Sequence, residues 1–371
     1  MKKVKFGKDI DRLIEHINNN HQIQLKSERQ KKELLNMGYF HSYKAYLFQK
    51  NPVNKLPIQN FDEIEKIYRL DNNLKALIYS KIMMLETAIK ARVITCIVSN
   101  NESSIYSIIN NEKNNIYKSY NSKKVELKLK KQDFENKLST HEFDNGEDAS
   151  IKHNIQNIEK SIKILNTNYK KQNKSILELQ NRIDSIISRD YSQSGITQHY
   201  MHKNESIPLW AYFELITFGD LGKFLSCLTE EMRVNICKAV KIYDSRFSPN
   251  ILTNSVYLLK DLRNAVAHNK VIFDCRFKTN RLNKELRQFF NRHLLVDVDI
   301  TFQSITDYIL TICYFLKSLE FANCEISTFF NEYKKIIFEL KNDNSFNKQI
   351  FDKLFNDIEI TKINKFSIDN L

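Results

Sequence analysis

Glycine and proline are scarce in this sequence. Only six glycines and four prolines occur in 371 residues, well below the usual share in a globular protein. Tight hairpins, bulges and the turns between strands and helices depend on these two residue types, which argues against a β-sandwich or a doubly wound sheet. No two glycines have the spacing of a phosphate-binding loop in the right context, so a nucleotide-binding loop of that kind is not expected.

Paired cysteines and long apolar runs are lacking as well. The six cysteines are scattered without a Cys-x-x-Cys pair, which predicts reduced, buried thiols instead of a disulfide or zinc framework. Charged residues interrupt the longest apolar stretches, around 82–98 and 305–316, and acidic residues follow the basic start of the chain before the apolar core of a signal peptide could form. We therefore expect a cytoplasmic protein that does not enter a membrane.

The charge that is present is mainly positive. Lysine and arginine total 57 against 44 aspartates and glutamates, a formal net charge of +13. Such a balance favours a polyanionic partner, either nucleic acid or an anionic surface, without choosing between them.

Helical periodicity runs through most of the chain and predicts an all-α fold. The clearest example is a helix from about 72 to 98, in which apolar residues keep a spacing of three or four and Lys75, Lys81 and Lys90 fall off the apolar stripe. Further helices are predicted at about 221–228, 230–243, 249–268, 280–293, 303–320 and 326–341. One exception is expected, a short two-stranded ladder that pairs residues 270–277 with 294–300.

A segment rich in lysine and asparagine, residues 111–190, differs from the rest. Its second half alternates spacings of four and three, and its first half does so more weakly. The seam positions are Ile116, Tyr120, Leu127, Phe134 and Leu138, then Ile151, Ile155, Ile158, Ile162, Leu165, Tyr169, Gln172, Ile176, Leu179, Ile183 and Ile186. We predict an antiparallel coiled-coil hairpin closed by an acidic turn at 141–148. A disordered insert is the alternative.

These patterns divide the chain into four predicted parts. They are an N-terminal helical region (1–70), a helical body (71–110 and 197–345), the projecting basic hairpin inserted into it (111–196) and a C-terminal tail (346–371).

The candidate catalytic residues lie in the stretch Asp-Leu-Arg-Asn-Ala-Val-Ala-His-Asn at 261–269, on the helix predicted to begin near Pro249. Arg263 lies at the edge of the apolar stripe of this helix, where a charge needs a partner or an interface. His268 lies about 140° around a straight helix from Arg263. Asn264 shares a face with His268 and can orient its imidazole. The arginine and the histidine therefore reach one phosphate only if the helix bends or ends here, or if several copies converge.

This Arg-x4-His spacing resembles the Arg-x4–6-His signature of HEPN-domain ribonucleases. Three other stretches resemble the bacterial abortive-infection (Abi) family of the AbiD/AbiF type, in order and in rough spacing: residues 32–40 followed by Tyr43, Leu-Glu-Thr-Ala-Ile-Lys-Ala-Arg at 85–92, and 208–219, which begins Pro-Leu-Trp and ends Thr-Phe-Gly. The resemblance covers about 25–100 and 200–275.

The resemblance implies a HEPN-like helical bundle and phage defence by an RNA-cleaving, growth-arresting protein. It implies a metal-independent endoribonuclease with Arg263, His268 and Asn264 as catalytic residues, Glu86 as a supporting residue, and no cofactor or metal. In that family two motifs build one cleft. The single credible motif here therefore implies a homodimer, held in check by an inhibitory non-coding RNA or a protein antitoxin.

RNA contacts are expected on the first half of the hairpin, because residues 112–140 hold eight lysines against four acidic residues. The candidates are Lys123, Lys124, Lys128, Lys130 and Lys131. In the rival hypothesis the protein is a non-catalytic RNA-binding or interaction module, in which the hairpin carries the function and the Arg–His motif is structural. A third class is a target of nucleotidyl modification by a neighbouring transferase.

Several other residues are given no functional role. Arg287 and His293 have a similar spacing but no specific polar neighbour, so we interpret them as a fortuitous match. His199 and His202 lie three apart without further ligands, so no metal site is expected. Trp210, Phe213 and Phe218 are interpreted as core residues in preference to a base-stacking platform. A plain Glu86–Lys90 pair is the alternative to a supporting role for Glu86.

Overall fold

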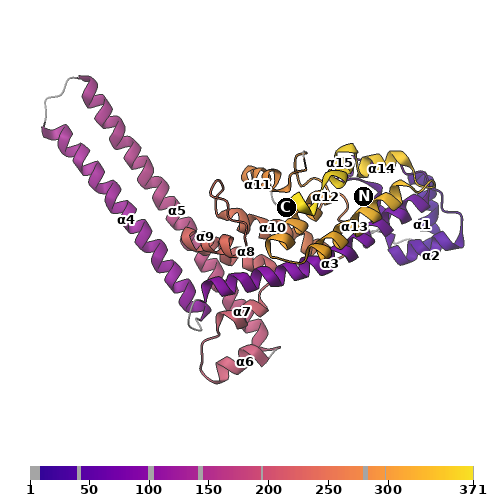
Figure 1. Ribbon diagram of the computed structural model, residues 1–371, viewed down its shortest axis with the longest axis horizontal. Helices are drawn as coiled ribbons and strands as arrows, with labels where there is room; N and C mark the ends of the chain where they lie inside the picture. The colour runs from indigo at the N-terminus through magenta and orange to yellow at the C-terminus, as the bar shows by residue number, and fades with distance from the viewer. Residues whose placement is uncertain are drawn as a thin grey trace, which may run out of the picture. The chain divides into compact units, whose positions relative to one another are not determined.

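A computed structural model describes residues 9–39, 43–98, 104–140, 145–193, 195–278, 283–296 and 298–370. The described residues form α-helices joined by turns and loops and contain no named strand, which confirms the predicted all-α class (Figure 1). Its α-helices are α1 (Ile10–His16), α2 (Glu28–Met37), α3 (Phe61–Ile97), α4 (Ile105–Thr140), α5 (Asn145–Tyr191), α6 (Gly195–His202), α7 (Leu209–Leu215), α8 (Phe218–Cys227), α9 (Glu230–Ala239), α10 (Asn250–Ala267), α11 (Lys284–Leu294), α12 (Ile305–Ser318), α13 (Asn323–Lys341), α14 (Lys348–Leu354) and α15 (Asp357–Lys365).

The chain folds into two compact units. The discontinuous unit combines Met1–Ile89 with Val240–Leu371, and the hairpin unit is Lys90–Ala239. The long helix α3 runs through the boundary. The four-part division drawn from sequence stays a prediction.

Helix α12 is the central helix of the discontinuous unit. Its first twelve residues, from Ile305 to Leu316, are all buried because α11, α13 and α15 pack around it. The buried Lys362 of α15 pairs with the buried Asp307 of α12 at 2.6 Å and with Glu359 at 3.0 Å. A buried charge is tolerated only with such partners, so the C-terminal residues are part of this core.

The two-stranded ladder predicted for 270–277 and 294–300 is wrong for the residues described. Residues 271–278 form successive turns, and Cys275 has a φ of +57°. The backbone N–H groups of Ile272 and Phe273 donate to the carboxylate of Asp71, at 2.9 and 2.8 Å. That carboxylate satisfies donors that a strand would have presented to its neighbour.

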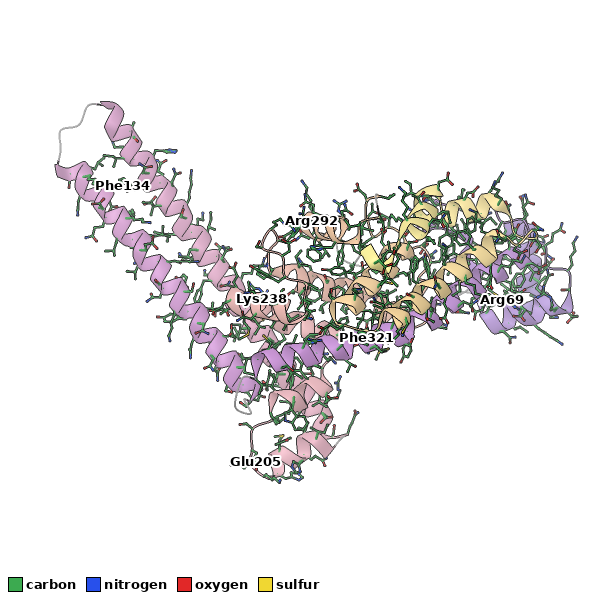
Figure 2. All side chains as sticks on the ribbon, in the orientation of Figure 1. Arg69, Phe134, Glu205, Lys238, Arg292 and Phe321 are labelled. Atoms are coloured by element: carbon green, nitrogen blue, oxygen red, sulfur yellow. The ribbon has the colours of Figure 1, made fainter. Side chains whose placement is uncertain are left out.

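Helices α4 and α5 lie side by side and run in opposite directions, as predicted for the hairpin (Figure 1). Cross-contacts fix the register: Tyr120 donates to Asn166 at 2.8 Å, and Lys131 pairs with Glu159 at 2.7 Å. Phe134 marks the seam near the far end of α4 (Figure 2). Residues 141–144 of the acidic turn, like the basic start at 1–8, lie outside the described residues, and α5 already begins at Asn145.

The hairpin seam changes along its length. Its distal apolar positions are half-buried, Gln172 is exposed, and the positions from Ile176 onward are buried. Near this base α5 packs against α6, α7 and α8 of the same unit. The base of the hairpin is therefore core, whereas the distal half only closes on itself.

Two further features concern the membrane and the thiols. In the described part of the chain, no helix combines the length and the hydrophobicity needed to span a bilayer. Four of the six cysteines are buried, Cys96 is half-buried and Cys324 is exposed, and all six are free thiols.

Candidate functional site

Arg263 is held on α10 by a carboxylate from α3. Its Nε donates to Oε2 of Glu86 at 3.1 Å, and the side chains are 25% and 6% exposed. The apolar stripe of α10 is buried as predicted, with Arg263 at its edge. In the described chain Nη1 and Nη2 of Arg263 bond no other residue. Since Glu86 occupies only Nε, the two terminal nitrogens can bind an oxyanion through two parallel hydrogen bonds.

Helix α10 ends at the predicted histidine. Ala267 is its last residue and His268 is the C-cap, fully on the surface. Asn269 adopts a left-handed conformation (φ +50°), its N–H donates to the carbonyl of Val266 at 3.2 Å, and that of Lys270 donates to Ala265 at 2.8 Å. This pair of bonds is the Schellman motif, which asparagine tolerates well. Its consequence is a solvent-facing imidazole at a defined helix end.

The contact between Asn264 and His268 runs through the backbone, because the N–H of His268 donates to the carbonyl oxygen of Asn264 at 3.0 Å. The Asn264 side chain is half-buried on the last turn of α10. His268 still starts about 140° around the helix axis from Arg263, because the helix remains regular up to Ala267. A single chain therefore presents its arginine and its histidine in different directions.

A polar cluster that the sequence did not point to holds the chain after His268. Nζ of Lys75 lies 2.8 Å from Asp71 and donates to Oδ1 of Asn269, also at 2.8 Å. Asp71 is fully buried and accepts from the Tyr46 hydroxyl at 2.8 Å. Lys75 is 8% exposed, so its predicted place off the apolar stripe is wrong. The only sequence signal was an Asp-x3-Lys pair one turn apart on an apolar helix.

Helix α3 thus supports the motif at two points. Glu86 binds the arginine, and three turns earlier Asp71 and Lys75 bind the loop that follows the histidine. These contacts hold the Arg263 side chain and the backbone that follows His268, whereas the imidazole itself is exposed.

The second Arg–His pair has a structural environment. His293 lies 3.2 Å from the carboxylate of Asp244, and its ring packs on Phe289 at 4.4 Å between centroids. Burial lowers the pKa of this imidazole, against the opposing effect of Asp244. Arg287 is exposed. His293 therefore packs as a core-edge residue, in contrast to the exposed His268.

The two closely spaced histidines, His199 and His202, each contact a neighbouring side chain. His202 lies 3.1 Å from the Tyr191 hydroxyl and His199 lies 3.2 Å from Nζ of Lys203. Among the described residues no group of three or more His, Cys, Asp or Glu side chains is arranged to hold a metal ion.

The predicted aromatic core is confirmed in part. Phe213 and Phe218 are 1% exposed, but Trp210 is 44% exposed and contacts the ring of Tyr200 edge-on. Trp210 is the second residue of α7, and its ring lies outside the core, whereas the preceding Leu209 is buried.

The five candidate RNA-binding lysines differ in their surroundings. Lys130 pairs with Glu126 at 2.6 Å and Lys131 pairs with Glu159 at 2.7 Å. Lys124 donates to the Tyr120 hydroxyl at 2.8 Å. Lys123 and Lys128 form no ion pair within the described chain and stay exposed. Exposed pairs are weak and exchange partners readily, so all five remain candidates, with Lys123 and Lys128 the most available.

Comparison with known protein families supports an assignment of this chain. A family model described as Abi-like protein matches residues 32–274. This range contains both anchoring points on α3, the whole hairpin and the end of α10. No curated protein and no solved structure matches the chain.

Proposed function

The chain belongs to the Abi-like protein family, and from this premise we propose that it acts in abortive-infection phage defence as a metal-independent endoribonuclease of the AbiD/AbiF type with a HEPN-like site. One observation carries the enzymatic part. An arginine whose terminal nitrogens bond no described residue and an exposed histidine lie five residues apart at one helix end, and α3 binds the arginine and the loop that follows the histidine.

RNA supplies its own nucleophile, so this site needs only proton transfer and charge stabilisation. His268 takes the proton of the 2′-hydroxyl, whose oxygen attacks the adjacent phosphorus. Arg263 binds the phosphate oxygens and stabilises the charge that develops on them. The bond to the 5′-oxygen then breaks, and a protonated histidine gives that oxygen its proton. The products are a 2′,3′-cyclic phosphate and a 5′-hydroxyl end, and the Asn264 turn holds the backbone of His268.

Cleavage is expected to persist in EDTA and to leave 2′,3′-cyclic phosphate ends, because every step above uses side chains of this protein and the RNA itself. Mapping of the cleaved ends with and without the chelator tests both points. Activity that disappears on chelation and returns with magnesium or manganese would place the reaction at another site.

A homodimer accounts for the divergent directions of the two side chains. Arg263 does not need a second chain for its counter-charge, because Glu86 of the same chain pairs with it. The angular separation from His268 remains, and a two-fold axis near the end of α10 brings the arginine of one protomer towards His268 of the partner subunit. Specific activity should then fall when the protein is diluted below the dimer dissociation constant. Light scattering at the same concentrations gives the control, and constant specific activity of a monomer would contradict the shared site.

The rival function, a hairpin that binds RNA without catalysis, is tested by shortening the hairpin where it closes only on itself. We expect a short glycine-rich turn in place of residues 125–163 to leave a folded protein, since none of the described residues removed is fully buried. The change removes Lys128, Lys130 and Lys131, so RNA binding should weaken and depend less steeply on salt. Melting temperature and salt-dependent filter binding are the measurements. Unchanged RNA binding would show that the distal hairpin does not contact RNA.

A further inference from the structure

A pocket of about 590 Å³ lies in the hairpin unit, where α4 and α5 meet the turn between α8 and α9. Its size falls within the range of about 300–1,000 Å³ that is typical of small-molecule sites. The pocket lies where the apolar seam of the hairpin gives way to polar residues. Gln172 lines it from a seam position, and two small side chains, Ser119 and Ser175, line it as well. A leucine or isoleucine at 172 would continue the seam, so the glutamine gives up packing at this position.

The walls of the pocket are basic. Lys123 from α4, Lys171 from α5 and Arg233 from α9 all line it, against a single acidic lining residue, Glu230. Neither lysine forms an ion pair with any residue that the structure describes, and both are exposed. Three cations around one cavity favour an anionic occupant.

Arg233 has donor capacity that the fold does not use. Nη1 donates to the carbonyl of Leu228, but the buried Nε has no hydrogen-bond partner. The buried Glu112 nearby accepts the backbone N–H of Thr229 at 2.6 Å. Burial lowers the pKa of Arg233, partly offset by Glu230 and other acidic neighbours. The buried Nε is closed to a ligand, so Arg233 favours an anionic occupant through the charge of its guanidinium at the wall of the pocket.

Helices α4 and α5, which carry the two lysines, also bring aromatic and amide groups to the pocket. Tyr120 and Tyr169 stack with ring centroids 4.0 Å apart and an interplanar angle of 11°, and both line the pocket. Asn115, Asn168 and Gln172 add amide donors and acceptors. Aromatic faces stack on bases and amides bond base edges, whereas lysine and arginine bind phosphate. A bare phosphate would leave most of this volume and the whole aromatic wall unused.

We propose that this pocket binds a nucleoside phosphate, with the phosphate towards Lys123, Lys171 and Arg233 and the base towards the Tyr120–Tyr169 pair. The occupant is either a free nucleotide or one nucleotide unit of an RNA strand, since both present the same groups. The site lies in the hairpin unit and uses neither Arg263 nor His268, so it does not depend on the ribonuclease proposal.

Calorimetric titration of the full-length protein with AMP, ATP, adenosine, inorganic phosphate and a 2′-O-methyl RNA octamer tests the proposal. The octamer cannot be cleaved through its 2′-oxygen, so binding is measured whether or not the protein is a ribonuclease. We expect the nucleotides or the octamer to bind more tightly than adenosine or phosphate. Binding of AMP or ATP identifies a free nucleotide as the ligand, and binding of the octamer alone identifies a strand.

Two variants and one control make the test specific. Lys123→Ala combined with Lys171→Ala should weaken binding about tenfold or more, because two charged contacts are lost. Gln172→Leu should also weaken binding while the melting temperature stays the same or rises, since it restores the apolar seam. Lys152→Ala combined with Lys160→Ala removes two exposed lysines from the distal part of α5 and should leave binding unchanged. Three results would overturn the proposal. The first is that neither nucleotide nor octamer binds, and the second is that phosphate binds as tightly as nucleotide. The third is that the Lys123/Lys171 variant and the Lys152/Lys160 control variant bind equally well.

Discussion

Replacement of His268 by alanine is expected to abolish RNA cleavage and growth arrest in a protein that stays folded. The loss of a general acid–base group costs about 10²–10⁴ in rate. The stability cost is small, within about 0.5 kcal/mol, because the side chain is exposed and the Schellman bonds use only backbone atoms. An RNA cleavage map in cells, viable counts and the melting temperature of the purified variant are the measurements.

His293→Ala is the matched control, because this histidine also follows an arginine at a similar spacing. It should keep cleavage while its melting temperature falls, since the change removes a contact with Asp244 and packing on Phe289. We therefore expect His268→Ala to lose activity and keep its stability, and His293→Ala to keep activity and lose stability. Full toxicity of a well-folded His268→Ala protein would contradict the enzymatic proposal.

Arg263→Lys is expected to lower the cleavage rate by about 10²–10³ while changing the melting temperature little. Lysine keeps a positive charge for Glu86 but lacks the planar fork that binds two phosphate oxygens at once. Loss of one donor that stabilises transition-state charge costs about this much in other enzymes. Single-turnover cleavage of a short RNA and thermal melting of the same preparation are the measurements.

Alanine at the same position is the less informative change. Arg263→Ala leaves the buried carboxylate of Glu86 without its arginine, and loss of one partner from a fully buried pair costs about 3–5 kcal/mol. The loss of stability is smaller here, because Arg263 is 25% exposed. A loss of activity in this variant could still come from unfolding as well as from catalysis. A Glu86→Gln variant shows how much activity depends on positioning of the arginine, and we expect a smaller loss than for Arg263→Lys. If Arg263→Lys cleaved RNA at the wild-type rate, Arg263 would have only a structural role, as the ion-pair partner of Glu86.

Local sequence patterns predict the helices of this protein, because helical structure depends on residues three and four apart. The apolar stripe of α10 and the apolar seams along which α4 and α5 pair follow from such local patterns. Residue spacing along one helix also identified Arg263 and His268 as candidates and predicted that they point in different directions around it. The position of Arg263 at the edge of the apolar stripe predicted that its charge needs a partner.

Which residues contact one another across the chain is set by long-range packing and could not be predicted from local patterns. Glu86 and Arg263 are 177 residues apart, and Asp71 reaches the N–H groups of Ile272 and Phe273 across 201 and 202 residues. The alternating pattern at 270–277 predicted a strand. Periodicity contains no information about the buried carboxylate of Asp71, which accepts the backbone N–H groups that a strand would use for pairing. Lys75 was placed off the apolar stripe for the same reason, since its burial depends on Asp71 and Asn269 together. Helix periodicity is a property of neighbours in the chain, whereas the partners of a charge are set by packing between distant segments.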